Sequence, residues 1–180
     1  AWKFYLIAAG ASIQMADGMQ ETLLTFLAQC ASGSLSLNAS QGAMIVAIIF
    51  LGEFFGAVLT GPLSDAFGRK KITISTGFIL TIFGLLAAAS NGYYFFLGTR
   101  FMVGVAGGLY PVNFDLYAEL LGSHRAIGLS ITTACFPLGA VLCTGAAWLW
   151  MDSFGWRFIT TILSLPSALG LIAMIYAVEE

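Results

Sequence analysis

The sequence predicts an all-α membrane protein, a bundle of six transmembrane helices. Only 9% of the 180 residues are charged and 59% are apolar, whereas a soluble domain is about a quarter charged. A globule of this length cannot hide so much apolar surface from water, so lipid must be the solvent for most of it. Apolar runs long enough to cross a bilayer also recur along the whole chain, so residues 1–180 form a single transmembrane domain.

The first three expected spans lie between polar or charged breaks, and each has the roughly 20 apolar residues that a crossing needs. The first covers residues 3–28 and ends before the loop "ASGSLSLNASQG" (31–42). The second covers 42–66 and contains Gly52 and Gly56, a spacing that lets helix backbones approach closely. The third covers 70–90 and ends at the turn residues "SNG".

The last three spans carry more glycine and proline. The fourth, 93–121, contains Gly104, Gly107, Gly108 and Pro111. The break "GSHR" (122–125) precedes the fifth span, and "MDSFG" (151–155) precedes the sixth. Proline is tolerated inside a membrane helix where neighbouring groups satisfy the freed backbone. The fifth and sixth spans are expected at residues 126–150 and 157–178.

Lysine and arginine gather on one side of the predicted bundle. With the N-terminus inside, the outer segments carry only Arg157. The inner segments carry Lys3, Arg69, Lys70, Lys71 and Arg125. The positive-inside rule therefore predicts a cytoplasmic N-terminus, or its topological equivalent in an organelle.

Six ionisable residues fall inside the expected spans, where each is costly unless it faces the bundle interior, a partner or water. At about 1.5 Å of rise per residue, four of them could share one layer in the outer half of the bundle. Three carboxylates and one guanidinium leave that layer negative, so a carboxylate should hold a proton or the layer should hold a cation. Alternatively, Glu21 or Glu53 faces a water-filled vestibule and is merely solvated. The four residues are Asp17, Glu21, Glu53 and Arg100.

Two carboxylate pairs have the four-residue spacing that places side chains on one helix face. Asp17 and Glu21 share a face with Gln14, and Gln20 extends this polar stripe on the first span. Asp115 and Glu119 lie near the inner end of the fourth span, where Glu119 can reach the region of Arg125. We expect a structural ion pair there, at the inner rim.

The loop "GPLSDAFGRKK" between the second and third spans resembles the signature loop of major facilitator superfamily transporters. "RFMVGVAGG", which begins at Arg100, resembles the helix-four motif of that family. "MADGMQETLLTF" and "PVNFDLYAELL" look like the group of synaptic vesicle glycoproteins and plant niacin-transporter-like proteins. The resemblance covers nearly the whole chain, but only the N-terminal six helices of a twelve-helix fold. The signature loop is matched at Gly61, Leu63, Ser64, Asp65, Gly68, Arg69 and Lys70.

The resemblance implies roles for two sets of residues. In such transporters the signature loop holds the two halves together on the cytoplasmic side, so the gate would comprise Gly61, Asp65, Gly68, Arg69 and Lys70. Proton-coupled sugar porters pair an aspartate of helix one with the arginine of helix four, and Asp17 and Arg100 occupy those places. Glu21 or Glu53 would then contact the substrate or a cation.

The chain also departs from the family pattern. In the branch that it resembles, an acidic residue usually stands where this chain has Gln20, and Glu21 follows one residue later. A one-residue shift turns a side chain by about 100° around the helix, so the same role does not follow. Glu53 stands at a position where an apolar residue is expected, and Glu119 lacks the proline that usually follows it.

These features lead to two hypotheses about function. The first is the N-terminal half of a secondary active transporter that moves a small polar or ionic solute by alternating access, with proton coupling. Its partners would be the bilayer, the solute, protons and a second six-helix half, supplied by the same chain, a second copy or another subunit. The alternative is a short six-helix chain that serves as a structural subunit of a larger membrane complex and transports nothing.

Other classes of protein find no support in the sequence. The net charge of −2 does not indicate a protein that binds nucleic acid. The three cysteines lack metal-ligand spacing, and the one histidine, His124, lies in a short polar loop. We therefore expect no enzyme activity, no catalytic residues, no metal and no cofactor.

Overall fold

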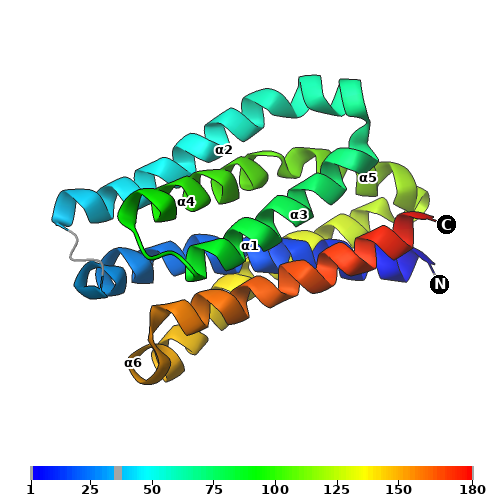
Figure 1. Ribbon diagram of the computed structural model, residues 1–180. Helices are drawn as coiled ribbons and strands as arrows, with labels where there is room; N and C mark the ends of the chain where they lie inside the picture. Colours follow the sequence, from blue (N-terminus) through cyan, green and yellow to red (C-terminus); the bar gives the residue numbers. More distant parts are fainter. Residues whose placement is uncertain (1, 35–37, 180) are drawn as a thin grey trace.

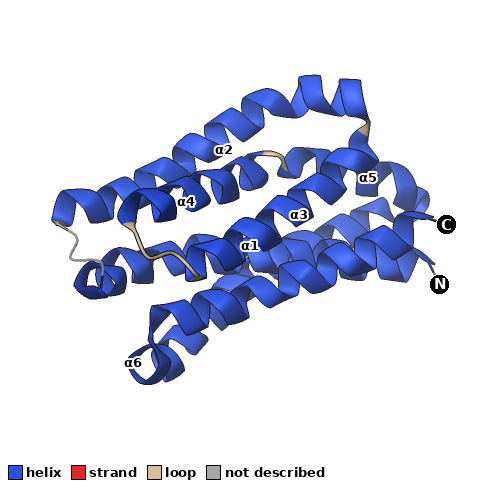
Figure 2. Ribbon diagram, in the orientation of Figure 1, coloured by secondary structure: helices blue, strands red, loops and turns tan. Residues whose placement is uncertain are grey.

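The computed structural model describes residues 2–34 and 38–179, which contain helices and no strand (Figures 1 and 2). The predicted all-α fold is confirmed. Both chain ends lie at the same end of the bundle (Figure 1). The helices are α1 (Trp2–Ser34), α2 (Ala39–Phe67), α3 (Arg69–Ala88), α4 (Tyr93–Gly108), α5 (Tyr110–Leu121) and α6 (Arg125–Glu179), with a 3₁₀ turn at Gly122–His124.

Three of these helices do not correspond to single expected spans. α4 and α5 share the expected fourth span and are separated only by Leu109, which has φ −85° and ψ −3°. The break falls just before Pro111, whose missing N–H and bulky ring interrupt helical hydrogen bonding. α6 is 55 residues long and contains Gly155 at φ 77° and ψ 169°. This conformation favours glycine, and it divides α6 into two helical segments.

By length and hydropathy, four helical stretches of the described residues can cross a membrane, whereas the sequence predicts six spans. One of the four is 59 residues long, enough for two crossings, because it takes in α4, α5 and the first segment of α6. α1 is long enough but is not among the four, because Gln14, Asp17, Gln20 and Glu21 lower its mean hydropathy. The stretches are Ser40–Phe67, Arg69–Ala88, Tyr93–Met151 and Ser153–Tyr176.

Glycines bring α2 and α4 into direct backbone contact. At each of four glycines, a Cβ atom would collide with a main-chain carbonyl oxygen of the opposite helix. The hydroxyl of Thr60 strengthens the contact, because it lies 2.9 Å from the carbonyl oxygens of Gly108 on α4 and of Gly56 in its own helix and shares its one proton between them. The glycines are Gly52 and Gly56 on α2, and Gly104 and Gly108 on α4.

α1 and the first segment of α6 meet in the same way. A Cβ at Gly18 would collide with the carbonyl oxygen of Phe136, and a Cβ at Gly139 would collide with that of Met15. Close packing of this kind supplies van der Waals contact where lipid provides no hydrophobic drive between helices. The bundle therefore contains two tightly joined helix pairs.

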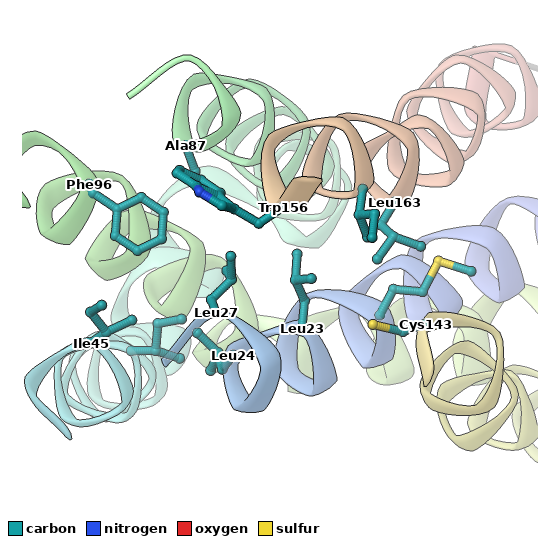
Figure 3. Packing of buried hydrophobic residues seen from close by; sticks show 12 residues of the cluster. Leu23, Leu24, Leu27, Ile45, Ala87, Phe96, Cys143, Trp156 and Leu163 are labelled. Carbon is teal, nitrogen blue, oxygen red and sulfur yellow. The ribbon is translucent and has the colours of Figure 1, made fainter. Parts of the chain in front are cut away.

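Apolar side chains fill the space between these pairs. Leu23 and Leu27 of α1 point toward Trp156 of α6, and Phe96 of α4 lies beside that ring (Figure 3). The rings of Phe96 and Trp156 are packed edge to face with centroids 5.6 Å apart. This cluster fixes α4 against the second segment of α6.

The backbone contact between α2 and α4 is tested by substituting single glycines. Gly104→Ala should lower the free energy of unfolding by about 1–3 kcal/mol, the usual cost of overpacking, because its methyl group meets the carbonyl of Ile49. Gly98 is a matched control on the same helix, since no atom lies within 4 Å of its Cβ position. Gly98→Ala should leave stability unchanged or raise it by up to about 1 kcal/mol. Thermal unfolding in detergent measures both, and equal effects would contradict the contact.

Candidate functional site

Three carboxylates line one pocket of about 280 Å³. Asp17 and Glu21 come from α1 and Glu53 comes from α2, and all three side chains are half-buried. α4 and α5 close the pocket where the helix breaks at Leu109. The remaining lining residues are Gln14, Ala57, Gly107, Gly108, Tyr110 and Pro111.

The absence of a side chain at Gly107 of α4 leaves room for these carboxylates to approach one another. A Cβ at Gly107 would lie 3.4 Å from Cγ of Glu53 and 3.7 Å from Oδ1 of Asp17. The hydroxyl of Tyr110 donates to the carbonyl oxygen of Ile13 at 3.1 Å and fixes the start of α5 against α1. The lining contains no lysine, arginine or histidine. The pocket therefore offers carboxylate, amide and carbonyl oxygens to a cation or to protons.

Arg100 lies apart from this pocket. Its side chain is fully buried, and its Nη1 donates to Oε1 of Gln20 at 2.9 Å. Nε2 of Gln20 donates in turn to Oγ of Ser164 at 2.9 Å. Among the described residues no ion pair joins Arg100 to Asp17, so the pairing implied by the family resemblance is not formed in this structure.

The structure thus brings together part of the residue set predicted from the sequence. Gln14, Asp17, Glu21 and Glu53 share the pocket, whereas Gln20 and Arg100 form a separate buried chain with Ser164. Sequence reasoning missed Ser164 and Tyr110. A small polar residue within the sixth span and a tyrosine beside Pro111 were the available signals.

At the end of the bundle where both termini lie, Arg69 pairs with Glu119. Nη1 of Arg69 lies 2.5 Å from Oε1 of Glu119, which joins the start of α3 to the end of α5. The sequence predicts Arg125 as the partner of Glu119, but the structure gives that place to Arg69. Asp115 and Arg125 are both exposed.

The signature loop contains the turn between α2 and α3. Gly68 is the single residue between the two helices, with φ 84° and ψ 147°, and its N–H donates to the carbonyl of Ser64 at 2.9 Å. Only glycine adopts this region readily. Gly61, Asp65 and Lys70 are exposed on either side of the turn.

Comparison with known proteins gives one family. Residues 10–180 match the model described as Major Facilitator Superfamily. "Organic cation/carnitine transporter 7" of Arabidopsis thaliana is 30% identical over 93% of this chain and 34% of its own length. "Synaptic vesicle glycoprotein 2A" of Homo sapiens is 30% identical over 87% of this chain and 21% of its own length. The chain thus spans about a third or less of these relatives.

Solved structures agree on the fold. The partially occluded inward-open form of the xylose transporter XylE from E. coli superposes with a TM-score of 0.82 at 18% identity, over 98% of this chain and 50% of that one. An inward-open form of the same transporter gives a TM-score of 0.80 at 19% identity, over 96% and 47%. At these identities the likeness concerns the fold alone.

The ion pair between Arg69 and Glu119 is tested by a double-mutant cycle. Both side chains are well exposed, at 40% and 58%, so the coupling energy from Arg69→Ala and Glu119→Ala should be only about 0.2–1 kcal/mol. Asp115→Ala replaces Glu119→Ala in the control cycle, one turn away on the same helix, and should show no coupling to Arg69. Urea unfolding at low salt measures both cycles. Equal coupling in the two cycles would contradict the pairing.

Proposed function

Because the chain belongs to the major facilitator superfamily, a family of membrane transporters, we propose that it forms the N-terminal six-helix half of a secondary active transporter. It is an integral membrane protein, and the proposed mechanism is alternating access, in which the two halves of the transporter rock around a shared site. The acidic pocket is the observation that carries this proposal.

A second six-helix half is needed to complete the site. In this fold the substrate lies near the bilayer midplane, between the two halves. The acidic pocket lies between α1, α2, α4 and α5, and Glu53 and Pro111 on its border are accessible. The relatives, about three times as long as this chain or more, support a second half in the same polypeptide. A second copy or another subunit would cover the same face.

The proposed solute is small and polar or ionic, and the pocket favours a cation. Three carboxylates converge there without a basic residue in the lining. The plant relative is named as an organic cation/carnitine transporter, which supports the same class of solute. Gln14 and Tyr110 add neutral polar groups that would orient it.

Proton coupling is proposed to run through Asp17. Asp17, Glu21 and Glu53 are too close together to remain ionised without cost, so a proton should replace the solute when the pocket empties. Arg100 would help to set the charge of this layer from its buried position behind α1. Movement of a proton with each transport cycle follows from this exchange.

The cytoplasmic gate is proposed at the turn between α2 and α3. Gly68 permits the tight turn, Gly61 lies within α2 about two helical turns before it, and Asp65, Arg69 and Lys70 present charge to the second half. Arg69 is paired with Glu119 inside this half, and an exposed ion pair of this kind, within one half or between the two, contributes about 1 kcal/mol or less. Contacts of this strength can form and break in each cycle, as a latch requires.

Proton coupling is tested with Asp17→Asn in proteoliposomes that contain the full chain. The variant should lose accumulation of a radiolabelled organic cation driven by a pH gradient, because the side chain no longer exchanges a proton. It should keep exchange of labelled for unlabelled solute in the absence of a gradient. Asp115→Asn, exposed and outside the pocket, is the control and should behave as wild type. Gradient-driven uptake by Asp17→Asn at the wild-type level would refute the coupling role.

The gate is tested by comparing Asp65→Asn with Lys71→Gln, which alters a neighbouring exposed charge outside the proposed set. Asp65→Asn should slow initial uptake several-fold while solute binding stays near wild type, since only the transition between states is affected. Lys71→Gln should change neither. Uptake rates and equilibrium binding measured on the same preparation distinguish the two effects. A parallel loss of binding would argue against a gating role.

A further inference from the structure

The guanidinium of Arg100 is held in place by a single side-chain hydrogen bond. An arginine has five N–H donors, and here Nη1 donates to Oε1 of Gln20 while the buried Nε and Nη2 have no partner. The ring of Phe96 lies 5.0 Å from Cζ of Arg100 and gives a further, non-directional contact. Gln20 is therefore the side chain that fixes the position of the guanidinium charge.

The orientation of Gln20 is in turn imposed by Ser164. The hydroxyl of Ser164 donates its one proton to the carbonyl oxygen of Thr160 at 2.8 Å, so its Oγ can only accept from Gln20. Because Ser164 accepts here, the amide group of Gln20 must direct Nε2 toward Ser164. Its Oε1 then faces Arg100. Gly84 leaves the necessary room, because a Cβ there would lie 2.7 Å from Oγ of Ser164 and 3.0 Å from Nε2 of Gln20.

The carboxylates of the acidic pocket lie next to this arrangement along α1. Asp17 is one helical turn from Gln20 on α1, and Glu21 is the next residue in sequence. Glu53 of α2 and the hydroxyl of Tyr110 complete the titratable groups in the pocket lining. A guanidinium released from Gln20 carries two unused donors beside α1, and Asp17 is a charge-assisted acceptor one turn away.

We infer that Gln20 is a positioning residue: fixed by Ser164, it holds Arg100 out of the acidic pocket and so keeps that pocket selective for cations. The selectivity for cations rests on the proposed function. The role of Gln20 in fixing the position of the guanidinium rests on the hydrogen bonds described above and does not depend on that function. Without Gln20, Arg100 pairs with Asp17, neutralises part of the pocket and competes with a cationic solute.

The first experiment measures the charge state of Asp17 and does not require transport. Dicyclohexylcarbodiimide modifies protonated carboxyl groups in apolar surroundings, and mass spectrometry of the α1 peptide quantifies its addition to Asp17. In full-chain protein in liposomes, Gln20→Leu should reduce this labelling several-fold, because pairing with Arg100 keeps Asp17 ionised. Gln20→Glu loses the donor to Ser164 but gives Arg100 a charged acceptor in the same place, so Arg100 should stay away from Asp17 and labelling should not fall below wild type.

If Gln20→Leu does not fold, Ser164→Ala provides a second test of the same inference. It removes one hydroxyl and frees the amide of Gln20 to rotate, so labelling of Asp17 should fall, though less than with Gln20→Leu. Ser167→Ala is the matched control, since Ser167 is buried one turn away on α6, accepts from Thr81, and donates to the backbone carbonyl of Ser164 but not to its side chain. Equal labelling of Asp17 in wild type, Ser164→Ala and Ser167→Ala would overturn the inference.

The second experiment measures uptake of tetraethylammonium by the same preparations. Gln20→Leu should raise KM several-fold with little change in kcat, whereas Gln20→Glu and Ser167→Ala should stay near wild type. An unchanged KM in Gln20→Leu would overturn the link to cation selectivity. If wild type takes up no tetraethylammonium or other cation, the proposed function fails, and carbodiimide labelling still decides the role of Gln20.

Discussion

Direct contact between helix backbones is the constraint on which the rest of this structure depends. Apolar side chains gain little from one another in lipid, so helices associate by close packing and by hydrogen bonds. At Gly52, Gly56, Gly104 and Gly108 the main chains of α2 and α4 touch without intervening side chains. This contact also brings Glu53 beside the bare backbone at Gly107, where it faces Asp17. Helix association and assembly of the pocket therefore have one cause.

The polar groups of the bundle form two arrangements with different physical characters. One is a buried chain from Arg100 through Gln20 to Ser164, in which each atom that takes part has a defined donor or acceptor role. The other is the half-buried pocket of carboxylates. Burial of the guanidinium costs several kcal/mol, while its hydrogen bond and the contact with Phe96 each return about 1–3 kcal/mol. The two arrangements meet on α1, where Gln20 of the buried chain is followed directly by Glu21 of the pocket.

The fold and most of the pocket follow from local features of the sequence, whereas the pairing of individual groups does not. Hydropathy and loop composition predict the helices, and four-residue spacing predicts that Asp17 and Glu21 share a face. The bond between Gln20 and Ser164 joins residues 144 positions apart, and no local pattern encodes it. The ion pair between Arg69 and Glu119 also joins residues far apart in the sequence, 50 positions from each other. The sequence favours Arg125 as the partner of Glu119 because it is nearer along the chain. These choices depend on tertiary packing and side-chain conformation.

The long sequence separation of these contacts constrains how the protein enters the membrane. Thr60 of α2 bonds to a carbonyl 48 residues later, and Gln20 of α1 accepts from an arginine 80 residues later. During synthesis, α1 and α2 must therefore leave the ribosome and meet the translocon with their polar groups still unpartnered. The first two helices therefore obtain these partners only after α4 has been translated, so the domain cannot reach its final packing one helix at a time.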